Sequence, residues 1–91
     1  MELGKIYQLI AQTPSGKEVK IYDAQIASKA IGSLKTNTNF ILLEYKVIPE
    51  ISIDIERDMK TNLIRAKVLT SEGISGVITL FPVHYRIEKV V

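Results

Sequence analysis

The sequence predicts an all-β fold of short antiparallel strands in one domain that spans residues 1–91. The apolar residues are mostly β-branched: the chain has 14 Ile, 7 Val and 6 Thr but only 5 Ala. Such side chains favour the pleated surface of strands over helices. Apolar residues also recur with a period of two in several runs separated by Gly, Pro or Asn, as in half-buried strands. A chain of 91 residues is long enough for one modest core.

The first third of the chain predicts two strands and a loop that leads into a third. Residues 5–12 alternate with apolar groups on both faces, and 13–16 form a turn because proline presets φ for its second position. A second strand covers 19–21. The stretch 23–34 has no sustained helical stripe, and Gly32 would break a helix early, so we expect an ordered loop that ends in a short strand.

A polar, Asn-rich connection at residues 35–39 leads into a strong strand. Apolar residues alternate over 40–47, so one face points inward, while the other is apolar at one end and charged at the other. Pro49 then interrupts the run. Because proline cannot donate a ladder hydrogen bond, we expect it at a sheet edge or a bulge.

An extended hairpin is predicted for Ile51 to Val68. Ile51, Ile53 and Ile55 alternate with Ser and acidic residues, the pattern of a half-buried antiparallel strand. Residues 57–62 form the polar tip, and 64–68 form the return strand. Such an exposed hairpin could add to the sheet of a second copy, so a homo-oligomer through residues 51–68 is an open alternative.

The last third predicts two more strands. Gly73 supplies the positive φ of a tight turn, and Gly76 is also expected to be a turn glycine. Residues 77–81 are apolar on both faces, so this strand should be central. The chain then bends at Pro82 and closes with a strand over 85–90.

Four segments of this pattern resemble SH3-type domains. Residues 19–34, which include the sequence I-G-S-L at 31–34, and residues 39–44 are similar to the opening of bacterial SH3 domains. Residues 72–77 and the L-F-P-V-H-Y run at 80–85 resemble the later hairpin and the closing turn. The resemblance implies a small SH3-like barrel of five to six antiparallel strands, which has few open edges. It also implies a non-enzymatic module that binds a protein or an extended peptide.

SH3 domains bind peptides through an aromatic groove whose rings stack on a polyproline II ligand. The resemblance places Tyr22, Pro82 and Tyr85 at groove positions, with Tyr7 near them, as the candidate partner-binding residues. The alternative is that these rings cap a small core and keep their hydroxyls in water. The sequence has no tryptophan, so a groove should be shallow.

The composition excludes several kinds of site. The absence of cysteine excludes thiolate metal sites and disulfides, and the single histidine, His84, excludes a Ser–His–Asp triad built elsewhere. We expect no catalytic residue, no cofactor and no metal. Asp54, Glu56 and Asp58 should form a solvated face that Arg65 or Lys67, across the hairpin, helps to neutralise.

The charge and hydropathy of the chain bear on its partners. The net charge of +2 gives no strong field for nucleic acid. A small nucleic-acid-binding barrel nevertheless stays an alternative, because basic residues gather in both halves and a tyrosine among them could stack on bases. A structural subunit of a homo-oligomeric assembly, such as a phage or viral one, is another. No run approaches a membrane span, and no secretory signal is recognisable, so a cytoplasmic location is the default expectation.

Overall fold

The structure is a computed structural model that describes residues 2–14, 16–26, 28–54 and 56–90, with the backbone alone at 50, 51, 53 and 54. In these residues the chain forms seven strands and no helix. The strands are β1 (Ile6–Ala11), β2 (Glu18–Tyr22), β3 (Ala30–Lys35), β4 (Asn39–Asp54), β5 (Met59–Thr70), β6 (Ser75–Leu80) and β7 (Tyr85–Lys89). The predicted all-β fold with an extended hairpin is therefore confirmed.

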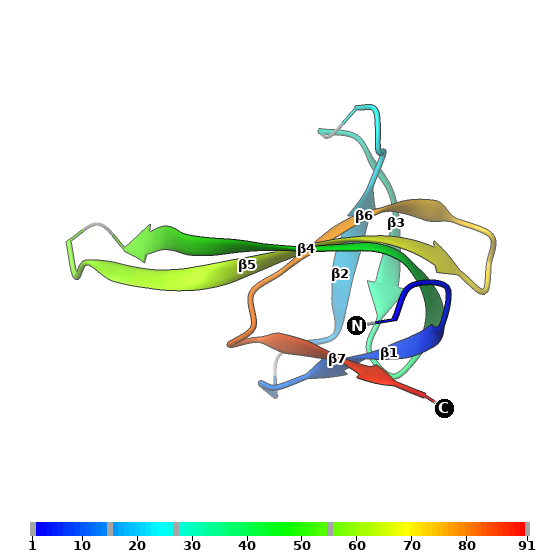
Figure 1. The fold of residues 1–91 in the computed structure, drawn as a ribbon, viewed down its shortest axis with the longest axis horizontal. Coiled ribbons are helices and arrows are strands. Elements are labelled where there is room, and N and C mark those ends of the chain that lie inside the picture. Colours follow the sequence, from blue (N-terminus) through cyan, green and yellow to red (C-terminus); the bar gives the residue numbers. More distant parts are fainter. Residues whose placement is uncertain (1, 15, 27, 55, 91) are drawn as a thin grey trace.

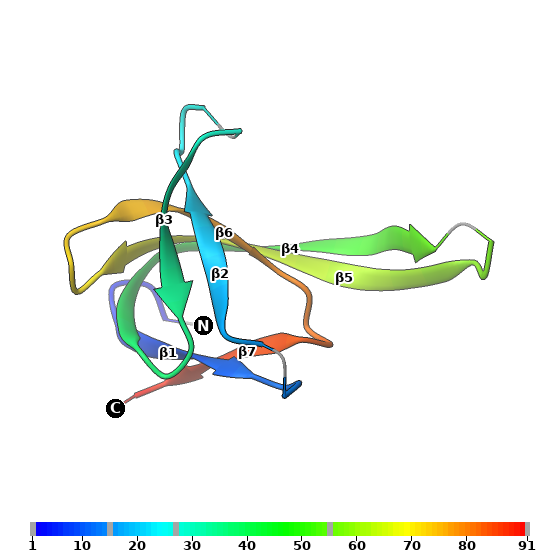
Figure 2. The same cartoon turned by 180° about the vertical axis from the view of Figure 1, so that it is seen from behind.

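One antiparallel sheet contains all of these strands, in the order β3-β2-β6-β5-β4-β1-β7. The sheet curls into a half-barrel, so that the β1–β7 pair and the β2–β3 hairpin lie on the same side of the β4–β5–β6 layer (Figures 1 and 2). Single hydrogen bonds cross between its two ends: the N–H of Asn37 donates to the Leu9 carbonyl over 2.8 Å, and the Tyr85 hydroxyl to the Glu18 carbonyl over 3.1 Å. The half-barrel thus closes without a continuous ladder between its outermost described strands.

The core fills the concave side of this sheet. Its buried side chains come from six of the strands and alternate with exposed ones, as the sequence predicts. They are Tyr7, Leu9, Ile21, Leu34, Phe40, Leu42, Ala66, Val68, Ile78 and Leu80. The strand β6 pairs on both sides, with β2 and with β5, which confirms the central position predicted for it.

The SH3-like barrel of five to six strands is short of the seven strands found in the described residues. The second strand and the short strand predicted after the loop are present as β2 and β3, which pair with each other from Glu18 and Lys35 onward. The turn predictions hold: Gly73 has a φ of 84°, and Asn37 in the Asn-rich connection has a φ of 66°. The prediction for Gly76 is wrong, because this residue lies inside β6 rather than in a turn.

The longest strand, β4, bends and continues through Pro49. Its pairing with β5 shifts register between Leu42 and Glu44 and again between Ile48 and Ile51, so Pro49 lies at an irregularity. Among the described residues, β4 pairs with β1 only at residues 39–41, which leaves Pro49 on an open edge. Both facts confirm the expected location of this proline.

The distal part of the β4–β5 hairpin projects from the half-barrel (Figure 1). We call residues 48–63 the arm. Here β5 has passed the end of its pairing with β6, which begins at Ile64, so in the described backbone the arm is a two-stranded ribbon. The arm accounts for the elongated shape, with principal extents of 41 × 29 × 25 Å.

Candidate functional site

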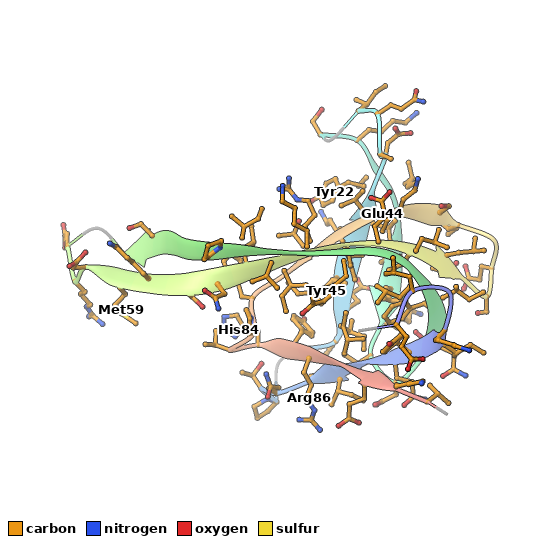
Figure 3. The ribbon with its side chains drawn as sticks, viewed as in Figure 1. Tyr22, Glu44, Tyr45, Met59, His84 and Arg86 are labelled. Carbon is orange, nitrogen blue, oxygen red and sulfur yellow. The ribbon has the colours of Figure 1, made fainter. Side chains whose placement is uncertain are left out.

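The convex side of the β2–β6–β5–β4 layer carries basic, acidic, aromatic and aliphatic side chains next to one another. Side chains on this side alternate with the buried core residues of the same strands, and the pairing registers place them in two rows. Figure 3 shows Tyr22 and Glu44 on this side of the β4–β5 ribbon, and Tyr45 and His84 on the other. We call this surface the outer face; it consists of Tyr22, Glu44, Lys46, Arg65, Lys67, Val77 and Thr79.

Two adjoining hollows cross the outer face. The larger, of about 350 Å³, is lined by Leu3 and by residues of β4, β5 and β6. The smaller, of about 180 Å³, is lined by Tyr22 and the two residues after it, together with β5 and β6. Arg65 and Val77 line both hollows. The two therefore form one depression that runs across four strands, with apolar surface at both ends.

Leu3 reaches this depression because the N-terminal segment lies against the edge of β4. The N–H of Gly4 donates to the Leu42 carbonyl over 2.7 Å, and the N–H of Leu42 donates to the Lys5 carbonyl over 3.1 Å. These bonds hold Leu3 beside the bend in β4, where its side chain is 55% exposed. An exposed leucine at the end of a depression offers apolar contact to a partner.

Three cations and two carboxylates, those of Glu44 and Asp23, line the depression. The ladder sets Arg65 opposite Lys46, and Lys67 opposite Glu44. Among the described residues, none of the three basic side chains forms a salt bridge. The local balance is therefore positive, and these charges are available to an acidic partner.

Asp23 also borders the smaller hollow, but its carboxylate is engaged in the local loop. The oxygen Oδ1 accepts hydrogen bonds from the N–H groups of Gln25 at 2.7 Å and Ile26 at 3.0 Å. These hydrogen bonds lower the pKa of Asp23, and the one from Ile26 has the larger effect. The carboxylate thus fixes the turn between β2 and β3 and stays ionised.

The position of Tyr22 depends on a close approach between two strands. Tyr22 pairs with Val77, the one ladder pair that joins β2 to β6 in the described backbone. Beside it, a Cβ on the buried Gly76 would lie only 2.4 Å from the Tyr22 carbonyl oxygen and 2.6 Å from Cγ2 of Ile21. A side chain does not fit at position 76, because the backbone of β2 occupies the space where its Cβ would lie.

The four residues predicted to bind a partner occupy different places. Tyr7 is only 3% exposed; its ring lies 6.4 Å from that of Phe40, and its hydroxyl bonds to the backbone of Glu2. Tyr85 packs against the core, and its hydroxyl donates to the Glu18 carbonyl.

Pro82 lies in the β6–β7 turn, where its carbonyl accepts a hydrogen bond from the side chain of Gln12. Tyr22 alone of the four lies on the outer face. The structure does not bring the four into one groove, because the β4–β5–β6 layer separates Tyr22 from the β6–β7 turn (Figures 1 and 3). The sequence therefore identified one residue of the depression.

The other lining residues were missed because they depend on strand register. The sequence prediction that Arg65 or Lys67 lies across from the acidic residues of the hairpin is wrong, since Asp54 pairs with Met59. The sequence did contain a sign of this charged surface, because charged residues alternate in both strands of the hairpin, at 44 and 46 and at 65 and 67. Pairing these charges correctly requires both an earlier turn and the register shifts between Ile48 and Ile51 and between Ser52 and Asp54.

A further hollow, of about 340 Å³, lies between β3 and the β5–β6 turn and is lined largely by polar residues. Two of its hydroxyls bond to the backbone: Thr38 Oγ1 donates to the Lys35 carbonyl at 2.6 Å, and Thr70 Oγ1 accepts from the N–H of Ile74 at 3.1 Å. These two hydroxyls stabilise turns, and the hollow lacks the row of three basic side chains that lies on the outer face.

The single histidine lies apart from the outer face (Figure 3). His84 is exposed in the β6–β7 turn, where its backbone bonds to Phe81 and Gln12. In the described ranges, no three His, Cys, Asp or Glu residues are grouped so that they could bind a metal. Nor does the described chain contain a helix that could span a membrane.

Comparison with protein-family models, with curated protein sequences and with solved structures gives no match to this chain. The resemblance to SH3 domains stays a prediction, and the function has to be inferred from the outer face itself.

Proposed function

We propose that this protein is a non-enzymatic binding module that recognises an acidic, extended segment of a protein partner on its outer face. The observation that carries the proposal is the depression in which the two hollows meet at Arg65 and Val77. It combines cations that lack a salt-bridge partner among the described residues with apolar surface from Leu3 and Tyr22. A peptide with alternating acidic and apolar side chains would match both.

This site differs from the groove implied by the SH3 resemblance. Of the aromatic residues expected in that groove, the outer face contains only Tyr22, and its other side chains are mostly charged residues of β4 and β5. Tyrosine is well suited to such a position because its ring supplies apolar contact and its hydroxyl can bond at the rim. The proposal therefore keeps the predicted class of function, protein or peptide binding, but moves the surface.

Single-stranded nucleic acid is the competing ligand, because phosphates and bases can also bind cations and a tyrosine. The outer face carries little positive charge for binding a phosphate backbone, because Glu44, opposite Lys67, offsets one of its three cations. The overall charge of +2 is also small for a nucleic-acid-binding protein. The binding experiment should therefore include an oligonucleotide as a second probe.

The test is a fluorescence titration with a labelled peptide in which glutamate and valine alternate. We expect salt-sensitive binding that weakens at least about tenfold in Arg65→Ala and in Tyr22→Ala. The matched control is Arg86→Ala, since Arg86 is paired with Glu88 on β7, away from the outer face. Binding that is unchanged by both outer-face substitutions, or tight binding of a single-stranded oligonucleotide in place of the peptide, would refute the proposal.

A further inference from the structure

The arm has a charge opposite to that of the outer face. Residues 50–60 contain four acidic and two basic residues, a net charge of −2. Lys46, Arg65 and Lys67 with Glu44 give the outer face a net charge of +2. The chain thus carries two complementary surfaces, and charge complementarity of this kind selects and orients a partner.

The two surfaces of one molecule cannot meet. The arm is a direct continuation of β4 and β5, the strands that contribute most of the outer face (Figure 1). Met59 at the tip and Arg65 on the outer face are six residues apart on the same strand. In extended backbone this separation is about 20 Å. A contact between tip and outer face must therefore join two molecules.

The edges of the arm are unsuited to pairing with another sheet. Pro49 interrupts the open edge of β4, and the pairing of β4 shifts register on both sides of it. Lys46 and Lys60 add charge near the open edges. Proline, bulges and lysine are the features by which proteins prevent strand addition. We therefore expect the arm to bind through its tip and side chains, which differs from strand addition through residues 51–68.

The tip also provides apolar surface that fits the depression. Met59 is 47% exposed at the start of β5, although methionine usually lies in a protein interior. At the other surface, Leu3 is 55% exposed and Val77 is half-buried in the larger hollow. Methionine adapts readily to an irregular apolar cavity. The acidic residues around Met59 would then lie near Lys46 and Arg65.

We infer that the outer face binds the arm of a second copy of this chain, so that copies associate head to tail. This inference rests on the proposed function and names the partner: the acidic extended segment is the arm itself. Because the two contacting surfaces differ, the contact is heterologous, and repeated contacts give a closed ring or an open filament. Each copy in the interior of such an assembly uses both surfaces.

The test reverses the charge of each surface by substitution and measures the mass of the protein by light scattering during gel filtration. The protein should exceed its monomer mass of 10.2 kDa as concentration rises, and should dissociate at high salt. Variant one reverses the face, with Arg65→Glu and Lys67→Glu; variant two reverses the arm, with Asp54→Lys and Glu56→Lys. Each alone should weaken association at least about tenfold.

The decisive step is to mix the two variants. Each then meets a surface of opposite charge on the other, so association should return in the mixture. The control is Lys17→Glu with Lys35→Glu, which changes the net charge by the same amount as variant one but at exposed lysines away from the outer face. It should associate as the unmodified protein does. Thermal melts of all variants verify that they are folded.

The outcomes separate this inference from the proposed function. A protein that stays at monomer mass at every concentration, or variants whose mixture does not reassociate, would overturn the head-to-tail contact. If the glutamate–valine peptide still binds in that case, the outer face is a binding site whose partner is another protein. If the peptide also fails to bind, both proposals fall.

Discussion

Gly76 provides the most direct test of how the outer face is built. In Gly76→Ala the new Cβ would lie 2.4 Å from the Tyr22 carbonyl oxygen and 2.6 Å from Ile21 Cγ2. A carbon and a carbonyl oxygen rarely approach closer than about 3.3 Å, so β2 and β6 must separate by about 1 Å. The obstacle is backbone, which cannot turn aside as a flexible side chain can.

The expected loss of stability follows from this geometry. Overpacking a buried position costs about 1–3 kcal/mol, and a backbone obstacle places Gly76→Ala near the upper end of that range. A chain of 91 residues has an unfolding entropy of about 190 cal/mol/K at its midpoint. A loss of about 3 kcal/mol therefore lowers Tm by about 15 °C. The assay is thermal denaturation followed by far-ultraviolet circular dichroism.

The matched control is Gly73→Asn, in the β5–β6 turn. Gly73 has a φ of 84° and open space around its missing Cβ, and asparagine tolerates this conformation better than other residues do. We expect its Tm to fall by less than about 5 °C. If Gly76→Ala lowers Tm no more than Gly73→Asn does, the close approach of β2 to β6 is not what requires a glycine at position 76.

Three further predictions test other parts of the fold. Leu9→Ala should cost about 2–5 kcal/mol in urea denaturation, because Leu9 is fully buried; a loss below about 1 kcal/mol would contradict its position in the core. In a carbon-detected NMR titration, Asp23 should titrate below an ordinary aspartate, since its pKa is lowered by the N–H groups of the loop. The stability that the ionised Asp23 carboxylate adds should be present at neutral pH and should be lost as the pH falls through that lowered pKa. If Asp23 titrates at the usual pKa of an aspartate, the hydrogen bonds of its carboxylate to the loop are contradicted. Lys89 contacts Glu2 at 2.8 Å on the surface, so Lys89→Met should return the pKa of Glu2 toward its usual value with little change in Tm.

The alternation of side chains along each strand could be predicted from the sequence. Ala66 and Val68 of β5 and Ile78 and Leu80 of β6 are buried at alternate apolar positions of their runs, and the turn at Gly73 follows from its residue type. These features are local: a period of two and a residue that tolerates positive φ determine them. The location of Pro49 at an irregular edge was predictable for the same reason.

The site could not be predicted, because it depends on contacts between distant segments. Placing Arg65 opposite Lys46 requires the register of the hairpin, and the irregularities between Ser52 and Asp54 and between Ile48 and Ile51 shift the pairs that follow them from the turn. Similarly, nothing near Gly76 in the sequence indicates that the backbone of β2 will lie against it. Tyr7 is buried on the concave side of the curled sheet, whereas Tyr22 lies on the convex side, on the outer face. Which side each tyrosine takes depends on how the whole sheet curls.

The pairing of β1 with β7 has a consequence for the order in which the chain folds. Tyr7 pairs with Lys89, so this ladder closes nearly the whole chain into a loop, whereas β4 and β5 are joined by a short turn. Closing a long loop costs more conformational entropy than closing a short one, and most side chains of β7 are exposed. We therefore expect the β4–β5 hairpin to form early, and the β1–β7 pair to form last and open first. In native-state hydrogen exchange, amides of β7 should lose protection before those of β5.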